Sequence, residues 1–506
     1  MATQTKEVFR KYTDAETFER IQEMDSVSEM WKRAVFEYDD RVAIEDNGQK
    51  YTYAQLEADA ADFRTVLSRA LPEEPGIRVG LLSANSYAFV KAYLAIVTLG
   101  YTAVILPAHL NETAVFGCCM KYGLKALVYQ PELKEKTAVA AEKAPQVPLL
   151  DIETVSGERT ELRSVEAQTP CVMMFTGGTT GRSKGALLSN GAVMQGTVNG
   201  CYGLKHVFGE RYILVLPLSH VFGLIRNLMT SLYTGSTLFI CRNNKDMFRD
   251  IAMFRPTVLV AVPALCEMAP NLSRKFGRNM LGEDMKCVIC GAAPVSPYLI
   301  EEYHKMGIEL LAGYGLTESA NLVSGNPESL RKPESVGLPY PNQKLRFVNG
   351  ELWLKGPNMM MGYVGEEGEE PYEDGWFKTG DLARMDEEGF LYITGRIKEI
   401  IILANGENVS PAEVEVHFNE LPFVQDSQVF EDVNEAGVHI LALEIVPRVS
   451  ELANVPEEER GAYMMEALKK VNAGLPSFQR VSRIEIRTTD FERTPSMKIA
   501  RYKKCK

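Results

Sequence analysis

The sequence has no long uninterrupted apolar run, few histidines and no excess of basic residues. The most apolar window, residues 88–106, is interrupted by Lys91 and Gly100, and the chain begins with a polar segment. We therefore expect no transmembrane segment, no signal peptide and a cytoplasmic location. The 55 basic and 67 acidic residues give a net charge of −12 without a strong basic cluster. A nucleic-acid partner is therefore not expected.

Cysteine is also sparse, with nine residues scattered along the chain. An odd number without a secretory signal favours reduced thiols over a disulfide framework. Cys287 and Cys290 form a CxxC pattern, but they lie in a strand-like run in which positions three apart point to opposite faces. No second pair accompanies them, so we expect buried core cysteines and no metal or redox site.

One glycine-rich stretch follows the short apolar run at residues 171–175 and precedes a helix expected near Asn190. Its small and hydroxyl-bearing residues and its lysine suit a polyphosphate, because glycine lets the backbone approach an anion and hydroxyls donate to it. The residues concerned are Thr176, Gly177, Gly178, Thr179, Thr180, Gly181 and Lys184. Ser183 precedes Lys184, which is not the order of a Walker A loop. A mobile glycine-rich surface loop is the alternative.

The 506 residues require at least two domains, and alternating strand and helix patterns predict a mainly parallel α/β sheet. Strands are expected at 77–82, 102–106, 212–216, 237–241, 257–262, 286–290 and 309–312, with helices at 27–36 and 86–99. Ligands of such sheets bind beyond the carboxyl ends of the strands. The loops at 217–223, 262–264, 291–294 and 313–319 are therefore candidate site loops. Residues 350–396 look β-rich and contain a hairpin, and a small α+β unit follows Arg396.

These motifs, in this order, resemble the acyl-adenylate-forming superfamily of acyl-CoA synthetases, adenylation domains and firefly luciferase. The resemblance extends from the glycine-rich loop through the Gly-Tyr-Gly-Leu-Thr-Glu motif at 313–318 and Thr379-Gly380-Asp381 to Lys498. It implies a large N-terminal domain, residues 1–396, with a β-rich subdomain, and a mobile C-terminal lid, residues 397–506. The implied reaction joins a carboxylic acid to coenzyme A through an acyl-AMP, with ATP and Mg²⁺.

The resemblance also implies a role for each motif residue. The glycine-rich loop with Lys184 would hold the β- and γ-phosphates, Thr317 the α-phosphate, and Glu318 the Mg²⁺, a cation that prefers oxygen ligands. Tyr314 would face adenine across a wall of Gly291, Ala292, Ala293 and Pro294, while Asp381 and Arg396 would bind the ribose or phosphate. Further nucleotide contacts are Gly315 and Ile393, and the acyl site comprises His220, Phe222, Val262 and Gly313. Lys498 would act in adenylation, Lys398 is the hinge, and Gly406 lies at the pantetheine tunnel.

Each of these residues also has an ordinary structural interpretation. Glu318 suits a helix N-terminus, Tyr314 a core position, Asp381 a turn, and His220 a helix start. Three features depart from the family: Gly177 stands where relatives usually have Ser, Met497 replaces a frequent Gly, and the loop at 403–409 is longer than in many relatives.

The acid itself is not specified by the motifs. Apolar side chains at Leu224, Ile225, Val262, Ala264, Ala292, Leu322 and Val323 suit a fatty or aryl acid, and Met497-Lys498 favours a fatty acid. A carrier-protein phosphopantetheine is the alternative acceptor to coenzyme A. An amino-acid substrate is disfavoured because no Asp occurs between Pro217 and Gly235. A non-catalytic sensor is disfavoured because Lys184, Glu318, Asp381 and Lys498 are all present.

Overall fold

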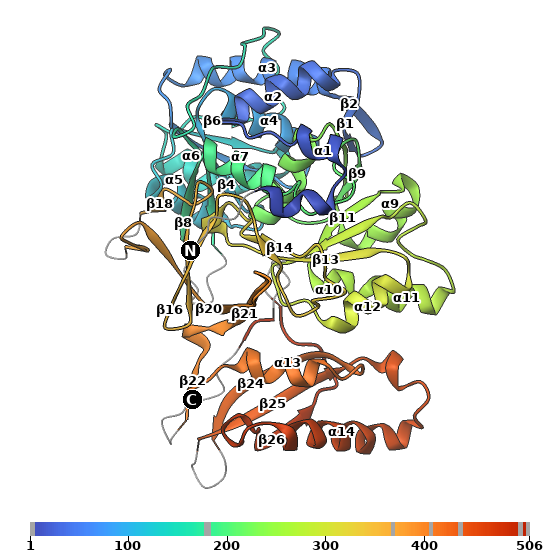
Figure 1. The fold of residues 1–506 in the computed structure, drawn as a ribbon. Coiled ribbons are helices and arrows are strands. Elements are labelled where there is room, and N and C mark those ends of the chain that lie inside the picture. The colour runs from blue at the N-terminus through green and yellow to red at the C-terminus, as the bar shows by residue number, and fades with distance from the viewer. Residues whose placement is uncertain are drawn as a thin grey trace.

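The computed structural model describes residues 6–176, 184–365, 370–403, 408–433, 439–493 and 499–501. Figure 1 shows a large part built from the chain up to about residue 400 and a smaller part built from the rest. This confirms the expected α/β fold with a large N-terminal and a small C-terminal domain. The small part has its own core, which begins at Ile401. The boundary between 396 and 397 remains a prediction.

One central sheet carries the glycine-rich loop at the end of β7. Its order is β18-β8-β7-β4-β3-β5-β6, with parallel pairing except at β7-β8 and β8-β18. The strands are β3 (Arg78–Leu82), β4 (Thr102–Leu106), β5 (Ala126–Tyr129), β6 (Leu149–Asp151), β7 (Pro170–Phe175), β8 (Gly185–Ser189) and β18 (Gly362–Val364). The expected strands at 77–82 and 102–106 are confirmed, and the apolar run at 171–175 lies in β7.

The second sheet carries the other predicted site loops. Its order is β15-β14-β13-β12-β11-β9-β10-β1-β2, and β13, β12, β11, β9, β10 and β1 run parallel. The strands are β1 (Val42–Asp46), β2 (Gln49–Thr52), β9 (Arg211–Leu214), β10 (Thr237–Ile240), β11 (Val258–Ala261), β12 (Cys287–Cys290), β13 (Glu309–Tyr314), β14 (Ser324–Gly325) and β15 (Leu338–Pro339). β13 continues two residues beyond its predicted end, so Gly313 and Tyr314 are strand residues.

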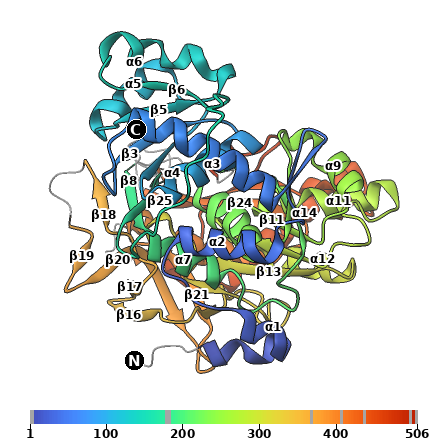
Figure 2. The ribbon, with the colours of Figure 1, turned by 90° about the horizontal axis from the view of Figure 1, so that it is seen from above.

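Helices fill the space between these sheets and cover their outer faces (Figures 1 and 2). The inner layer contacts strands of both sheets: α2 (Val27–Tyr38), α3 (Tyr53–Ala70), α4 (Tyr87–Thr98), α7 (Asn190–Asn199), α8 (Thr230–Tyr233) and the π-helix η3 (Phe222–Met229). The outer helices are α5 (Glu112–Lys121), α6 (Ala138–Lys143), α9 (Met247–Phe254), α10 (Pro263–Cys266), α11 (Met268–Phe276) and α12 (Pro297–Lys305), while η1 (Lys6–Tyr12) and α1 (Ala15–Arg20) lead into the fold. Short polar side chains start many of these helices by accepting a backbone N–H, as Ser26, Thr52, Ser86 and Ser189 do.

A smaller β-rich subdomain follows the second sheet. It comprises β16 (Lys344–Val348), β17 (Glu351–Lys355), β19 (Tyr372–Glu373), β20 (Trp376–Met385) and β21 (Leu391–Arg396), and the hairpin β20-β21 was expected. Val323 packs into the core of this subdomain with Leu345 and Leu352. A place for Val323 beside the acyl group stays a prediction.

The C-terminal part is a small α+β unit, as predicted. It contains β22 (Ile401–Ile402), β23 (Asn408–Val409), α13 (Pro411–Asn419), β24 (Val424–Val433), β25 (His439–Pro447), α14 (Arg460–Gly474) and β26 (Arg483–Ile486). The 3₁₀ turn η6 (Ile397–Glu399) precedes the two-residue strand β22.

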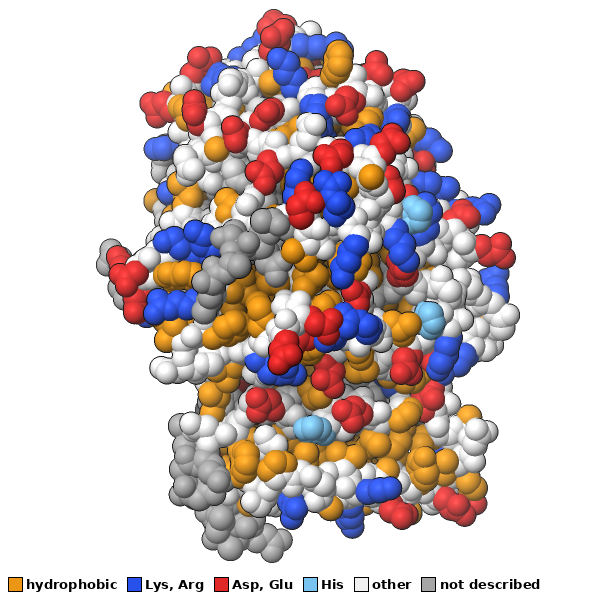
Figure 3. Space-filling view, viewed as in Figure 1, with side chains coloured by type: hydrophobic (Ala, Val, Ile, Leu, Met, Phe, Trp, Pro, Cys, Tyr) orange, Lys and Arg blue, Asp and Glu red, His pale blue; other side chains and the backbone are white. Residues whose placement is uncertain are grey.

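The surface carries both signs of charge, interspersed on the face drawn in Figure 3. Among the described helices, none combines the length and apolar character that a membrane crossing requires.

Candidate active site

The ends of the glycine-rich loop are held together by a short backbone bridge. The N–H of Thr176 donates to the carbonyl of Lys184 at 2.9 Å, and the N–H of Lys184 donates to Thr176 Oγ1 at 3.3 Å. Gly177, Gly178, Thr179, Thr180 and Gly181 lie outside the described residues. The structure therefore fixes the two ends of the loop, at the edge where β7 ends.

Tyr363 links the two predicted phosphate and metal residues. Its hydroxyl donates to Glu318 Oε1 at 2.6 Å, and Lys184 Nζ lies 5.0 Å from the centre of its ring. Three segments far apart in sequence thus meet here: the start of β8, the turn after β13, and β18. The carboxylate of Glu318 with an adjacent cation suits a magnesium–phosphate group, since Mg²⁺ takes one or two carboxylates beside phosphate oxygens. No sequence motif predicted a role for Tyr363.

A second group forms around Asp381 on β20, which is 1% exposed. Its Oδ2 accepts from the Tyr314 hydroxyl at 2.5 Å, and its Oδ1 pairs with Arg396 Nε at 2.8 Å. The charge of Asp381 raises the pKa of Arg396, and burial, reinforced by Asp381, raises the pKa of Tyr314. Three residues predicted to contact the nucleoside are therefore in one hydrogen-bonded group, which fixes the tyrosine ring.

Glycines allow close backbone approach beside this group. A Cβ on Gly291 would lie 3.2 Å from the carbonyl oxygen of Gly313 and 3.5 Å from Cζ of Phe222. A Cβ on Gly315 would lie only 1.1 Å from the carbonyl oxygen of Asn321, so no other residue fits there without moving the backbone. Parts of the predicted nucleotide wall and acyl site, from β12, β13 and η3, are thus in direct contact.

The remaining predicted wall and acyl residues lie at the same ends of the strands. Ala292 has φ 68°, a left-handed conformation that turns the chain sharply after β12. Ala293 is half-buried and Pro294 is exposed, while Ile393 is half-buried on β21. Val262 is buried directly after β11.

His220 lies just before η3 and is half-buried. Its Nδ1 accepts a hydrogen bond from the N–H of Phe222 at 3.3 Å. This contact fits the alternative role of His220, which is to accept a backbone N–H at the start of a helix. An acyl-binding role for His220 stays a prediction.

Arg226, in η3, is a second residue for which no sequence motif predicted a role. It is 2% exposed, and its Nη1 has no hydrogen-bond partner among the described residues. A signal was present, since it is the only charged residue in the segment Phe222–Met229.

The lid residues are only partly described. Lys398 is exposed in η6, where the chain passes between the two domains. Lys498 and Gly406 lie outside the described residues. Arg493 and Ile499, which flank the segment of Lys498, pair through an isolated β-bridge. Thr317 is buried at the start of the turn η5 (Thr317–Ser319).

Cys287 and Cys290 are buried strand residues, as predicted. The eight described cysteines are all free, and the described part of the chain contains no cluster of three or more potential metal ligands.

Two family models match successive parts of the chain. A family model described as AMP-binding enzyme matches residues 31–364, and one described as AMP-binding enzyme C-terminal domain matches residues 398–506. A feruloyl-CoA synthase from Amycolatopsis sp is 29% identical over 76% of this chain and 81% of its own length. A long-chain-fatty-acid–CoA ligase from Mycobacterium bovis is 27% identical over 85% of this chain and 86% of its own length.

Solved structures are similar over nearly the whole chain. O-succinylbenzoate coenzyme A synthetase from Bacillus subtilis, in complex with ATP and magnesium ion, has a TM-score of 0.75 at 25% identity and covers 93% of this chain and 98% of that one. An anthranilate CoA ligase in complex with anthranoyl-AMP has a TM-score of 0.82 at 18% identity, covers 94% of this chain and 95% of that one, and shows the shared fold.

Proposed function

The chain belongs to the AMP-binding enzyme family of acid–thiol ligases, and from that premise we propose that it joins a carboxylic acid to coenzyme A. The acid first attacks the α-phosphorus of ATP, which gives acyl-AMP and pyrophosphate. The coenzyme A thiol then attacks the acyl carbonyl and releases AMP. The observation that carries the proposal is that Lys184, Tyr363 and Glu318 form one group and Tyr314, Asp381 and Arg396 another, with Tyr314 and Glu318 only four residues apart in the chain.

We assign the residues of these two groups to different parts of ATP. Lys184 and the loop that it closes neutralise the β- and γ-phosphates, and Thr317 contacts the α-phosphate. Glu318 is the residue that would hold Mg²⁺, which supplies charge neutralisation at the phosphates when bound. Asp381 accepts ribose hydroxyls while Tyr314 faces the adenine against residues 291–294. Positioning and charge neutralisation are what phosphoryl and nucleotidyl transfer require of a protein.

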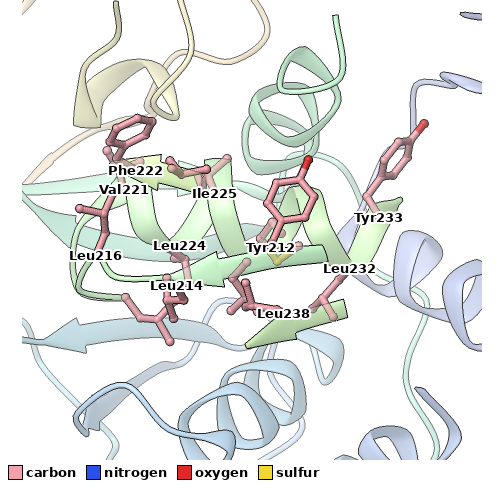
Figure 4. Close-up of a cluster of buried hydrophobic side chains, with 14 of the residues drawn as sticks. Tyr212, Leu214, Leu216, Val221, Phe222, Leu224, Ile225, Leu232, Tyr233 and Leu238 are labelled. Carbon is pink, nitrogen blue, oxygen red and sulfur yellow. The ribbon is translucent and has the colours of Figure 1, made fainter. Parts of the chain in front are cut away.

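The acyl group extends from Gly313 and Gly291 toward Phe222, His220 and Val262. Buried apolar side chains such as Leu224 and Ile225 pack along η3, and Figure 4 shows them in one cluster with Phe222 and Tyr212. This supports an acid with an apolar body, fatty or aryl. The similar proteins include ligases named for both kinds of acid.

The C-terminal domain, which we place at 397–506, contributes Lys498 to adenylation and Gly406 to the tunnel for the coenzyme A thiol. Lys398 is the hinge between this domain and the N-terminal domain.

A cytoplasmic location is supported by the free cysteines, seven of them buried and one half-buried, which suit a reducing compartment.

The test is a panel of fatty, aryl and amino acids assayed for pyrophosphate release, with and without coenzyme A, and with the products identified by mass spectrometry. We expect AMP, pyrophosphate and an acyl-CoA from a fatty or aryl acid. A dominant amino-acid substrate, or transfer to a carrier protein but not to coenzyme A, would overturn the proposal.

A further inference from the structure

A buried cation without a counter-ion lies in the middle of the π-helix η3. Arg226 is 2% exposed, and among the described residues no Asp or Glu forms an ion pair with it and its Nη1 donates to nothing. Within the same part of the chain, it lies over no aromatic ring. Burying a charge without a partner is costly, so buried guanidinium groups are normally paired. The other buried arginines of the described residues, Arg64 and Arg448, follow this rule because they pair with Glu57 and Glu267.

The described ionisable groups on which the charge of Arg226 acts include two cysteines and two tyrosines, Cys201, Cys287, Tyr212 and Tyr340. The Arg226 Cδ would lie 3.3 Å from a Cβ on Gly200, so a glycine at the end of α7 makes room for its stem. Burial raises the pKa of Tyr212 and of Tyr340, and the nearby charge of Arg226 opposes that rise in both. The Tyr212 hydroxyl also has no hydrogen-bond partner among the described residues. The two side chains lie close enough for Arg226 to oppose the rise in the pKa of Tyr212, and no carboxylate among the described residues accepts from Arg226 Nη1 or from the Tyr212 hydroxyl.

This region is continuous with the proposed acyl site in two ways. Phe222, whose Cζ would lie 3.5 Å from a Cβ on Gly291, is four residues before Arg226, so the two are about one turn apart on η3. The Tyr340 hydroxyl lies over Gly325, where it would be 2.1 Å from a Cβ, and Gly325 pairs in register with Gly313. An acyl group that starts at Gly313 and runs along η3 therefore extends toward Arg226.

We propose that Arg226 binds a second carboxylate of the acid substrate, at the end remote from the carboxylate that is activated. The substrate is then a dicarboxylic acid with an apolar middle. The carboxylate accepts from the guanidinium and from the Tyr212 hydroxyl, and it supplies a counter-charge that none of the described residues supplies. Charge-assisted hydrogen bonds of this kind are among the strongest that a site offers. The inference rests on the proposed ligase function and names its substrate class.

The first experiment uses the unmodified enzyme. Pyrophosphate release is measured for linear and aromatic acids in matched pairs, each with and without a second carboxylate, over a series of lengths. We expect one length at which the dicarboxylic acid exceeds its monocarboxylic partner in kcat/KM by about 100-fold or more, since a site built for a polar group rejects analogues that lack it. If no dicarboxylic acid exceeds its partner, the inference is wrong. If no acid of either kind releases pyrophosphate, the ligase function itself is wrong.

The second experiment assigns the preference to the side chain. Arg226→Met should lower kcat/KM for the dicarboxylic acid about 100-fold more than for the monocarboxylic acid, and Arg226→Lys should restore part of the difference. The matched control is Arg64→Met, which removes a buried but paired arginine and should affect both acids equally. An equal loss for both acids in Arg226→Met would show a structural role and overturn the inference. If Arg226→Met does not fold, the inference is tested by the selectivity of the unmodified enzyme and by Arg226→Lys, which should lower kcat/KM more for the dicarboxylic than for the monocarboxylic acid.

Discussion

Asp381 shows how much a single buried carboxylate does at this site. Both of its oxygens are used, one by the Tyr314 hydroxyl and one by Arg396. A residue in a simple turn would not need two such partners. The pair of contacts instead orients Asp381 and restrains the Tyr314 ring, so that both are held in place before the nucleotide arrives, which lowers the cost of binding.

We expect Asp381→Ala to weaken ATP binding by roughly 1.5–3 kcal/mol, because ribose hydroxyls lose a charge-assisted partner. Asp381→Asn, which keeps the shape, should lose less. The dissociation constant is measured by calorimetric titration with ATP. The control is Asp386→Asn in the turn between β20 and β21, which should leave the constant unchanged. An unchanged constant in Asp381→Ala would assign Asp381 to the turn alone.

The element that most constrains the site is the turn from β13 into η5. Gly315 lies between Tyr314 and Thr317, and an added Cβ would collide with the carbonyl of Asn321. Asn321 and Ala320 both have left-handed backbones, with φ 75° and 46°, so the chain folds back tightly on itself here. That fold is what places Glu318 against Tyr363 while Tyr314 reaches Asp381.

Gly315→Ala should lower the free energy of unfolding by about 2 kcal/mol or more, because the turn must open to admit the methyl group. It should also weaken ATP binding, since Tyr314 and Glu318 both move. Thermal unfolding and calorimetry measure the two effects. The matched control is Gly117→Ala in α5, where a Cβ meets nothing within 4 Å and helix propensity predicts a gain of up to about 1 kcal/mol. Equal stability of the two variants would contradict the argument.

At the scale of the whole molecule, Arg448 of the lid and Glu267 and Tyr298 of the large domain form a contact between the two domains, which we call the clamp. Arg448, 2% exposed at the end of β25, donates to Glu267 at 2.9 Å and to the carbonyls of Pro422 and Val424. Its guanidinium lies 4.0 Å from the centre of the Tyr298 ring. Burial raises the pKa of Glu267 despite the nearby arginine.

A second contact lies beside this clamp. Arg274 pairs with Glu451, whose carboxylate also accepts from the Tyr298 hydroxyl at 2.8 Å. The Arg448–Glu267 and Arg274–Glu451 ion pairs must both break if the lid rotates about Lys398.

Arg448→Met should therefore change the balance between the two half-reactions. The step that uses the clamped arrangement should slow about tenfold, since a buried charge pair is lost and Glu267 is left alone, while the other step should not slow. Acyl-AMP formation and thioester formation are measured separately in single turnovers. Asp284→Asn, which removes a more exposed pair with Arg255, is the control. Equal slowing of both steps by Arg448→Met would exclude a clamp function.

The two lid lysines give a complementary prediction. Lys498→Ala should lower acyl-AMP formation by about 10²–10³ and spare thioester formation from preformed acyl-AMP, because the lysine stabilises charge that develops only in the first step. Lys398→Pro should hinder rotation and spare adenylation, because proline fixes φ and removes a donor. The same single-turnover assays apply. Equal loss of both steps in both variants would mean that one static site serves the whole reaction.

The sequence by itself determined the family, the fold class and the positions of the site loops. These follow from short-range patterns: a strand followed by glycines and hydroxyls, a Gly-Tyr-Gly turn, and alternating apolar runs. Lys184, Glu318, Tyr314, Asp381 and Arg396 could be named in advance because each stands in such a pattern.

Only the tertiary structure decided which of these residues touch and which others join them. Tyr363 reaches Glu318 from a strand 45 residues away in sequence, and Arg448 reaches Glu267 across 181. In the sequence Arg226 is one charge in an apolar segment, and only the packing shows that it is buried with no counter-ion among the described residues. The reason is physical: the energy of a buried charge depends on which groups surround it, and those groups come from distant parts of the chain.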